Sequence, residues 1–446
     1  MQSEIQNGDS DAYYAAYAAA KERYLEALLA KINVEALRLA ASRARGEDIC
    51  CRIPALDDYI DDPASRLSLV SSQCGGQNCH LDVEFADGVT WIARIRLDDP
   101  MLPPPDIQAR IFLSEVATLI FLAGTKVPAP HVYGSALESP ENPVGTSYVF
   151  MEKLAGKPLD WNGANTEQRF RVMEQLADVY LELERHPLPL SGSMSLRAPA
   201  VKAAIDGDQI EVSSFAQLPY FETPNQGLGP FRTLEAAYTA IIHQQMQTLA
   251  NHEISSLPLD NYLTFLWRLK VLPKLIANSA SREGPFYLKH YDDKGDHILV
   301  DEKHNITGII DWEFASTDSK ELAFSSPCMM WPVGKFYEGN NDLTEDEIRF
   351  AAIFDARGRE DIGDMIRRGR QWQRFLYFIG GGISEDREEF ESLFLGLRKS
   401  CVWDDGDILP YVDWKAGFLC GDVTSDAQVQ ALMQYEQEQA VKLLSE

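Results

Sequence analysis

The segment LKHYDDKGDHILVD, residues 288–301, places four aspartates and two histidines around the start of an apolar run. Carboxylates crowded into one turn repel one another unless a cation or a protonated group lies among them. A solvated acidic loop is the simplest alternative explanation for such a segment in an acidic chain. The residues that follow decide between the two explanations.

Two apolar segments, 297–301 and 306–312, follow the acidic turn and predict an antiparallel β-hairpin. Because strands of a short hairpin run side by side, we expect His297 and Asp311 at the same end of it. The loop that carries Asp292 leaves from that end as well. Carboxylates that are distant in sequence therefore converge, which a solvated loop does not require, and the pattern favours a divalent-cation site.

This region resembles the catalytic core of the aminoglycoside phosphotransferase family, in its fungal-type branch of kinase-like small-molecule phosphotransferases. The matching residues are His290-Tyr291-Asp292 and Ile309-Ile310-Asp311-Trp312-Glu313. The resemblance implies an α+β, protein-kinase-like two-lobed fold with a small mixed β-sheet N-lobe and a large, mainly helical C-lobe. The catalytic loop and hairpin of that C-lobe would be residues 288–313.

The resemblance also implies roles for individual residues. Asp292 would be the catalytic base, Asp311 the principal magnesium ligand, and His290 a structural residue that braces the loop. His297 stands where the family has a second metal-binding asparagine. Imidazole suits softer metals than Mg²⁺, so either Asp296 supplies an oxygen ligand instead or the site prefers Mn²⁺.

A basic residue and an acidic residue of the N-lobe are expected to form an ion pair. By the resemblance, Arg94 in the segment 91–97 contacts the phosphates of the nucleotide and Glu115 pairs with it; Arg96, on the same strand face, is the alternative. An independent argument supports the pair, because Glu115 lies within an apolar helical stripe and a carboxylate there needs a cationic partner.

Two further segments resemble nucleotide-binding parts of the family. Backbone groups of Met151, Glu152 and Lys153 would bind the adenine at the hinge between the lobes. Gly75 and Gly76 lie in a flexible segment that occupies the place of the phosphate-covering loop. A short buried strand and a glycine pair are common features, so neither segment is specific by itself.

Local patterns predict the arrangement around these motifs. We expect an N-terminal helical arm over residues 1–60, the N-lobe over 61–155 and the C-lobe over 156–446. Alternating apolar and polar residues, turn residues, helical periodicity and capping boxes predict the individual elements. These are helices over 10–46, 111–124, 165–185, 233–250 and 258–278 and from Thr344 onward, a hairpin over 80–97 and a strand over 146–154.

Composition limits the classes of function. A chain of 446 residues with 45% hydrophobic and 24% charged residues is typical of a globular protein with two or three packed units. The net charge of −27 disfavours nucleic acid and anionic lipid as partners and weakly favours a cationic ligand. No apolar run is long enough to span a bilayer, the acidic N-terminus is unlike a signal peptide, and seven scattered cysteines favour reduced thiols in the cytoplasm.

The sequence therefore predicts an ATP-dependent kinase that phosphorylates a hydroxyl of a small molecule and uses ATP with Mg²⁺ or Mn²⁺. The alternative is a catalytically impaired, kinase-like protein that binds a nucleotide or metabolite. Tyr291, in place of a small glycine beside Asp292, and His297 favour that alternative, whereas the retained Asp292 favours the enzyme. Another ATP-using reaction, such as nucleotidyl transfer, also remains open. The sequence specifies neither the acceptor nor the oligomeric state.

Overall fold

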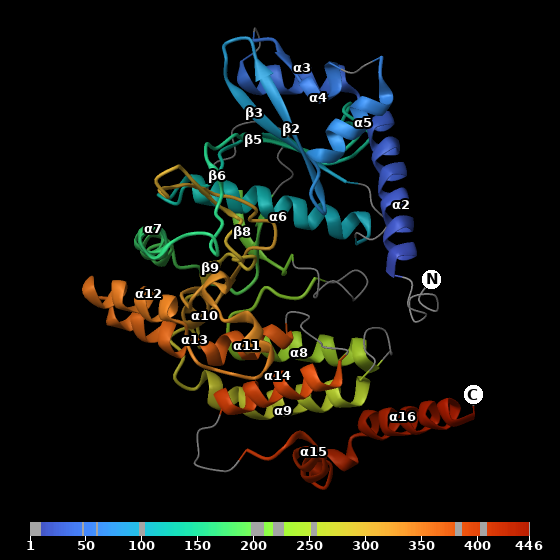
Figure 1. The fold of residues 1–446 in the computed structure, drawn as a ribbon, viewed down its shortest axis with the longest axis vertical. Helices are drawn as coiled ribbons and strands as arrows, with labels where there is room; N and C mark the ends of the chain where they lie inside the picture. The colour runs from blue at the N-terminus through green and yellow to red at the C-terminus, as the bar shows by residue number, and fades with distance from the viewer. Residues whose placement is uncertain are drawn as a thin grey trace.

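The computed structural model describes residues 10–46, 49–58, 61–97, 103–197, 209–216, 227–250, 257–379, 386–401 and 408–445. Strands and helices of the N-terminal part form one lobe, and the helices of the C-terminal part form a larger second lobe (Figure 1). This is the α+β two-lobed arrangement that the sequence predicts. Among the described residues, no helix combines the length and the apolar composition that crossing a bilayer requires.

The sheet of the N-lobe is antiparallel, with strand order β1-β2-β3-β5-β4. Its strands are β1 (Cys51–Arg52), β2 (Asn78–Phe85), β3 (Thr90–Arg96), β4 (Val132–Ala136) and β5 (Tyr148–Glu152). The predicted β2–β3 hairpin is confirmed, and Gly88 in its turn has a φ of 86°, which glycine adopts without steric cost. β3 is the central strand, so its backbone pairs on both edges, with β2 and with β5.

Helices from the described N-terminal residues flank or follow this sheet. They are α2 (Ser10–Lys31), α3 (Val34–Arg45), α4 (Pro54–Asp57), α5 (Pro63–Ser72) and α6 (Pro105–Ala123). α6 ends at Gly124 as predicted but begins at Pro105, ahead of the expected residue 111. Proline is compatible with the first turn of a helix, where its missing N–H has no partner to lose. Apolar residues of α6 share one core with the C-lobe hairpin.

Helices dominate the C-lobe. They are α7 (Thr166–Glu184), α8 (Leu234–Ala250), α9 (Pro258–Ile276), α10 (Lys320–Ala323), α11 (Val333–Tyr337), α12 (Glu345–Ala356), α13 (Glu360–Ile379), α14 (Arg387–Ser400), α15 (Tyr411–Leu419) and α16 (Ala427–Ser445), with 3₁₀ turns η3 (Cys328–Met330) and η4 (Asp422–Ser425). Both predicted capping boxes are present, Asn165 with Gln168 and Thr344 with Glu347.

Short strands carry the acidic segment of the C-lobe. They are β6 (Lys157–Pro158), β7 (Ser193–Leu196), β8 (Ile210–Ser213), β9 (Tyr287–Lys289), β10 (Ile298–Val300), β11 (Ile306–Ile309) and β12 (Ser316–Asp318). The β10–β11 hairpin forms as predicted, with Ile298 opposite Ile309 and a register shift between Leu299 and Val300. β9 pairs with β12 and β10 pairs with β11, so residues 290–297 connect two separate strand pairs. We call residues 290–297 the acidic loop.

Candidate functional site

Arg94 joins the two lobes. It is 6% exposed on the central strand β3, and its guanidinium forms an ion pair with Glu115 of α6, which is 4% exposed. The predicted pair is therefore confirmed, and the expectation that a buried carboxylate needs a cation holds. Nη2 of Arg94 also lies 3.1 Å from Oδ1 of Asp311, at the end of the C-lobe hairpin.

Arg96 pairs with Glu313, not with Glu115. Its Nη1 contacts Oε1 of Glu313, and Nη2 of Arg94 lies 2.6 Å from Oε2 of the same carboxylate. Asn78 of β2 donates its side-chain N–H to Glu313 Oε2 at 3.0 Å. Sequence reasoning assigned Glu313 and Asn78 no role. Glu313 follows Asp311 by two residues, and that spacing is the one signal that could have suggested a shared direction.

Asp311 has an unusual backbone conformation. Its φ is 63°, in the left-handed region that residues other than glycine seldom adopt, although aspartate is enriched there. The carbonyl of the preceding Ile310 lies 2.9 Å from Nε2 of His290, so the predicted bracing contact of His290 is present. The side chain of Asp311 is 52% exposed. A conformation of this kind is typical of residues that neighbours hold in place at functional sites.

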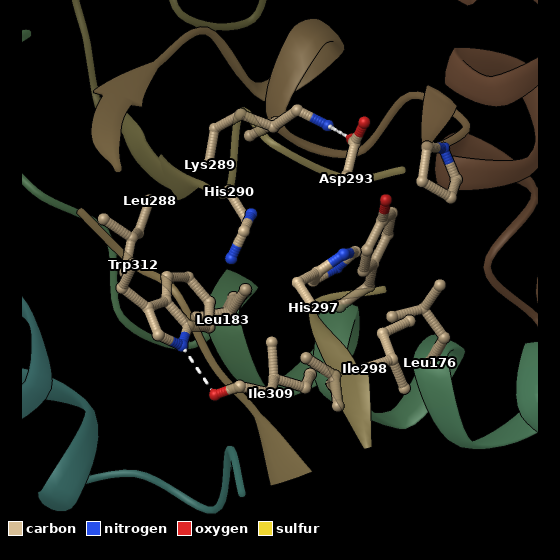
Figure 2. Close-up of a pocket in the computed structure, with 14 residues that line it drawn as sticks. Leu176, Leu183, Leu288, Lys289, His290, Asp293, His297, Ile298, Ile309 and Trp312 are labelled. Carbon is tan, nitrogen blue, oxygen red and sulfur yellow. Dashed lines mark hydrogen bonds and ion pairs between the residues drawn. The ribbon is translucent and has the colours of Figure 1, made fainter. Parts of the chain in front are cut away.

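His290 and His297 lie together beneath the hairpin, with ring centroids 4.3 Å apart (Figure 2). Ile310 N–H donates to the carbonyl of His297 at 2.9 Å, which confirms that His297 and Asp311 lie at the same end of the hairpin. Burial lowers the pKa of His290 and lowers that of His297 further, so both rings are neutral near pH 7. Nδ1 of His297 accepts the backbone N–H of Gly295 at 3.3 Å.

Lysines neutralise two of the crowded aspartates. Lys289 Nζ lies 2.6 Å from Oδ2 of the buried Asp293 (Figure 2), whose Oδ1 accepts the backbone N–H of Cys328 at 2.8 Å. Lys294 Nζ lies 3.1 Å from Oδ1 of Asp292, and the hydrogen bond between them raises the pKa of Lys294. The crowding is thus partly a local ion-pair arrangement. The side chain of Asp292 remains 42% exposed.

The cavity in Figure 2 is too small to bind a substrate. Its volume is about 30 Å³ and its walls are mostly apolar, with Lys289, Asp293 and the two histidines among them. Ligand pockets usually measure about 300–1,000 Å³. The cavity therefore belongs to the packing beneath the acidic loop.

Tyr291 is tied to the neighbouring strand. Its hydroxyl donates to Oδ2 of Asp318 at 2.8 Å, and the hydroxyl of Tyr238 donates to Oδ1 at 2.6 Å. Burial raises the pKa of Asp318, although the tyrosine hydroxyls and the Ser319 N–H act against that rise. The bulk that the sequence places beside Asp292 is therefore directed toward β12.

The three predicted metal ligands differ in their exposure to solvent. Asp311 has a half-exposed carboxylate, Asp296 is exposed and His297 is buried. Within the part of the chain that the structure describes, no three His, Cys, Asp or Glu side chains are grouped to hold one ion. Mg²⁺ commonly uses one or two protein carboxylates together with substrate phosphates, and Asp311 fits that pattern. The buried imidazole of His297 does not suit Mg²⁺.

The predicted hinge residues lie at the end of β5. Met151 is buried and pairs with both β3 and β4, and the N–H of Glu152 donates to the carbonyl of His131 at 2.8 Å. Lys153 follows the strand, and its side chain forms a surface ion pair with Asp82 at 2.6 Å. The adenine contact of these three residues stays a prediction.

The segment with Gly75 and Gly76 precedes β2, next to the arginines of β3. Both glycines are exposed. Cys74 and Cys79 are joined by a disulfide, which contradicts the expectation that all cysteines are reduced. The physical reason is the tight turn between them, in which Gly75 N–H donates to the carbonyl of Asn78 at 2.8 Å and brings the two cysteines opposite each other.

Solved structures that resemble this chain include two aminoglycoside phosphotransferases and an ethanolamine kinase. A putative aminoglycoside phosphotransferase from Ralstonia eutropha is 15% identical, with 83% of this chain and 96% of that one covered and a TM-score of 0.45. A thermostable APH(4)-Ia mutant in complex with AMP-PNP and hygromycin B is 17% identical, with 73% and 91% covered and a TM-score of 0.43. An ethanolamine kinase from Plasmodium vivax is 13% identical, with 80% and 82% covered and a TM-score of 0.40.

The relatives found by sequence match a shorter segment of the chain. A subtelomeric hrmA-associated cluster protein of Aspergillus fumigatus, found in two strains, is 37% identical over 123 residues. That stretch is 27% of this chain and 23% of the relative, so the match spans about a quarter of the relative's length. The family model described as the phosphotransferase enzyme family, APH, matches residues 82–319, more than half of the chain and the region that holds Arg94, Glu115 and the acidic loop. The chain belongs to this phosphotransferase family.

Proposed function

We propose that the chain transfers the terminal phosphoryl group of ATP to a hydroxyl group of a small molecule. The observation that carries the proposal is the meeting of Arg94, Glu115 and Asp311 beside the loop with Asp292. A buried cation held by the buried carboxylates of Glu115 and Glu313, together with the half-exposed carboxylate of Asp311, supplies the groups that phosphoryl transfer needs for binding phosphates and their counter-ion.

Each residue has a separate task in this proposal. Glu115 orients the guanidinium of Arg94, which neutralises charge on the phosphates. Asp292 accepts the proton of the acceptor hydroxyl while the oxygen of that hydroxyl bonds to the transferred phosphorus. Lys294 holds the carboxylate of Asp292 in place. Asp311 would hold a divalent cation, which supplies positive charge to the phosphates when bound. The products are ADP and a phosphate monoester.

The acceptor belongs to the same proposal. We propose a small hydroxylated molecule and favour one that carries a positive charge, because the chain has a net charge of −27. The test uses a panel of hydroxylated amines and matched neutral alcohols with the purified chain, ATP and either Mg²⁺ or Mn²⁺. ADP release above the rate without acceptor identifies a substrate.

Two variants test the assigned roles. Asp292→Asn should bind ATP like the wild type while phosphoryl transfer falls by about 10²–10⁴-fold, the usual contribution of a positioned base. Asp311→Asn should lose metal-dependent nucleotide binding, because the carboxylate that holds the cation has become neutral. Calorimetry measures binding and ADP release measures transfer. Equal turnover of Asp292→Asn and the wild type would exclude Asp292 as the base.

A nucleotide-binding protein without transfer activity is the second candidate. His297 in place of the family's asparagine favours it, since this substitution removes an oxygen ligand. Metal-dependent binding of ATP without release of ADP, with every acceptor and with both cations, would select this candidate over the kinase.

A further inference from the structure

A disulfide closes the loop between α5 and β2. Cys74 follows the last turn of α5, and Cys79 is the second residue of β2. The residues between them form a tight turn in which the Gly75 N–H is already bonded to the Asn78 carbonyl at 2.8 Å. We call residues 74–79 the cystine loop. In this form the loop is short, and one of its backbone donors is used internally.

The cystine loop contacts the charged residues that join the lobes. Oε1 of Gln77 accepts a hydrogen bond from Nη2 of Arg96 at 2.6 Å, and the side-chain N–H of Asn78 donates to Oε2 of Glu313 at 3.0 Å. Glu313 in turn binds Arg94, whose other contacts are Glu115 and Asp311. The position of the loop is therefore coupled to the side chains that would bind the phosphates.

The surroundings of the two cysteines suit both redox states. Cys74 is partly exposed, whereas Cys79 is 1% exposed, so a reagent in solution reaches Cys74 first. Sγ of Cys74 also lies 3.1 Å from the carbonyl oxygen of Val70. A disulfide sulfur has no hydrogen to donate, but the thiol of reduced Cys74 would donate to this carbonyl. The thiol of the reduced form therefore has a hydrogen-bond acceptor within reach.

From these contacts we infer that Cys74 and Cys79 form a reversible redox modification site that controls nucleotide binding. The inference rests on the proposed function, since it regulates the same site. In the disulfide form, the loop is held by its cross-link, and the N–H of Gly75 is unavailable to a phosphate. Reduction releases the loop, so that its backbone can close over the phosphates. Losing one backbone hydrogen bond to a charged group weakens nucleotide binding by about tenfold or more.

The chemistry is thiol–disulfide exchange with a small-molecule disulfide such as oxidised glutathione. The thiolate of Cys74 attacks one glutathione sulfur and releases one glutathione thiol, which leaves a mixed disulfide on Cys74. Cys79 then attacks the Cys74 sulfur and releases the second glutathione thiol. Two protein thiols lose two electrons and two protons, and one oxidised glutathione becomes two reduced ones. A dithiol reductant reverses the reaction.

The test compares redox forms of the full chain with ADP and Mg²⁺, and then with Mn²⁺, as the probe. Peptide mapping after alkylation reports whether oxidised glutathione forms the Cys74–Cys79 link, and calorimetry measures ADP affinity in each form. The oxidised wild type should bind ADP about tenfold more weakly than the reduced wild type. Cys74→Ser should keep the reduced affinity in both treatments. Cys420→Ser, a matched control at an exposed cysteine outside the site, should respond like the wild type.

Three results would overturn the inference. They are absence of the Cys74–Cys79 link after oxidation, equal ADP affinity in both redox forms, and a Cys74→Ser variant that still responds to oxidised glutathione. Equal affinity in both forms leaves the proposed kinase function standing. A chain that binds no ADP in any form, the reduced Cys74→Ser variant included, contradicts the kinase proposal and the control of nucleotide binding together.

Discussion

His297 is the residue at which this chain departs most from the family pattern in its acidic loop. Its ring is buried against His290, and its Nδ1 accepts the N–H of Gly295, so in the neutral ring Nε2 carries the proton. Burial keeps the ring neutral near pH 7, and the lone pair that a cation would need is the one on Nδ1, which accepts the Gly295 N–H. The residue therefore has the protonation state of a metal ligand without the oxygen chemistry that Mg²⁺ prefers.

The substitution His297→Asn tests this ligand. If His297 binds the cation, the wild type should bind ADP more tightly with Mn²⁺ than with Mg²⁺, and the variant should gain affinity with Mg²⁺ because an amide oxygen suits the harder ion. Calorimetry with each cation measures the preference. Asp296→Ala is the matched control. An unchanged metal preference in His297→Asn, with a loss in Asp296→Ala, would transfer the role to Asp296.

Tyr291 departs from the family pattern, and its hydroxyl bonds to Asp318, which lies 27 residues further along the chain. Tyr291→Phe removes one of the two phenol donors to the buried Asp318 and should lower the free energy of unfolding by about 1–3 kcal/mol, the cost of an unsatisfied buried acceptor. Turnover should fall as well, because Tyr291 adjoins Asp292. Urea unfolding and ADP release are the measurements.

Tyr238→Phe removes the other phenol donor from the same carboxylate, but Tyr238 belongs to α8 and is not a neighbour of Asp292 in sequence. It should lower stability by a similar amount and leave turnover unchanged. Equal losses of turnover in both variants would show that Tyr291 contributes to stability alone.

At the scale of elements, charged side chains hold the end of α7 to α10 and to the connection between α12 and α13. Glu184 accepts two contacts from Arg359, one of 2.6 Å to Nη2, and Lys320 Nζ lies 2.6 Å from its Oε1. Burial raises the pKa of Glu184, but the hydrogen bonds from Arg359 and Lys320 lower it more, and the net pKa is below the usual value. The ionised form is therefore the one that the fold stabilises.

Glu184→Gln should destabilise the chain in a pH-dependent manner. Because the pKa of Glu184 is lower in the folded state, its contribution is complete above about pH 4.5 and is lost as the pH falls through the folded value. The variant should lose about 1–3 kcal/mol at pH 7, and the difference from the wild type should shrink as the pH falls below about 4.5. Urea unfolding across this range is the measurement. A constant difference at every pH would contradict the ionic explanation.

At the scale of the whole molecule, the two lobes meet through a shared core and a charged junction. Residues of α6 and of the β10–β11 hairpin pack into one apolar cluster. Beside it, Glu313 receives Arg94 and Arg96 from β3, and all three side chains are nearly fully buried. Removing one partner from a buried ion pair leaves an uncompensated charge, which is costly.

Glu313→Gln should therefore lower the free energy of unfolding by about 3–5 kcal/mol. Glu84→Gln is the matched control, because Glu84 lies on the same sheet and forms an exposed ion pair with Arg52 at 2.8 Å. Exposed pairs contribute about 0–1 kcal/mol, so this control should change little. Urea unfolding compares the two. Similar small effects would show that the junction does not hold the lobes together.

Local sequence was enough to predict several of the elements and the end of the hairpin at which Asp311 lies. The capping boxes at Asn165 and Thr344, the turn at Gly88 and the hairpin that ends at Asp311 depend on residues within a few positions of one another. Hydrogen-bond patterns and side-chain periodicity act over that distance, so the sequence by itself determines them. The same reasoning found that Glu115 needs a cation, because its apolar surroundings lie on its own helix.

Only the tertiary structure decided which cation Glu115 receives, and that Glu313 and Asn78 belong to the same junction. Arg94 and Glu313 are 219 residues apart in sequence, and Asn78 and Glu313 are 235 apart. Arg94 and Arg96 lie on the same face of one strand, so the local sequence does not distinguish them. Their partners depend on how α6 and the hairpin pack against the sheet. Such contacts are set by the burial of charge between distant elements, which no local pattern of residues records.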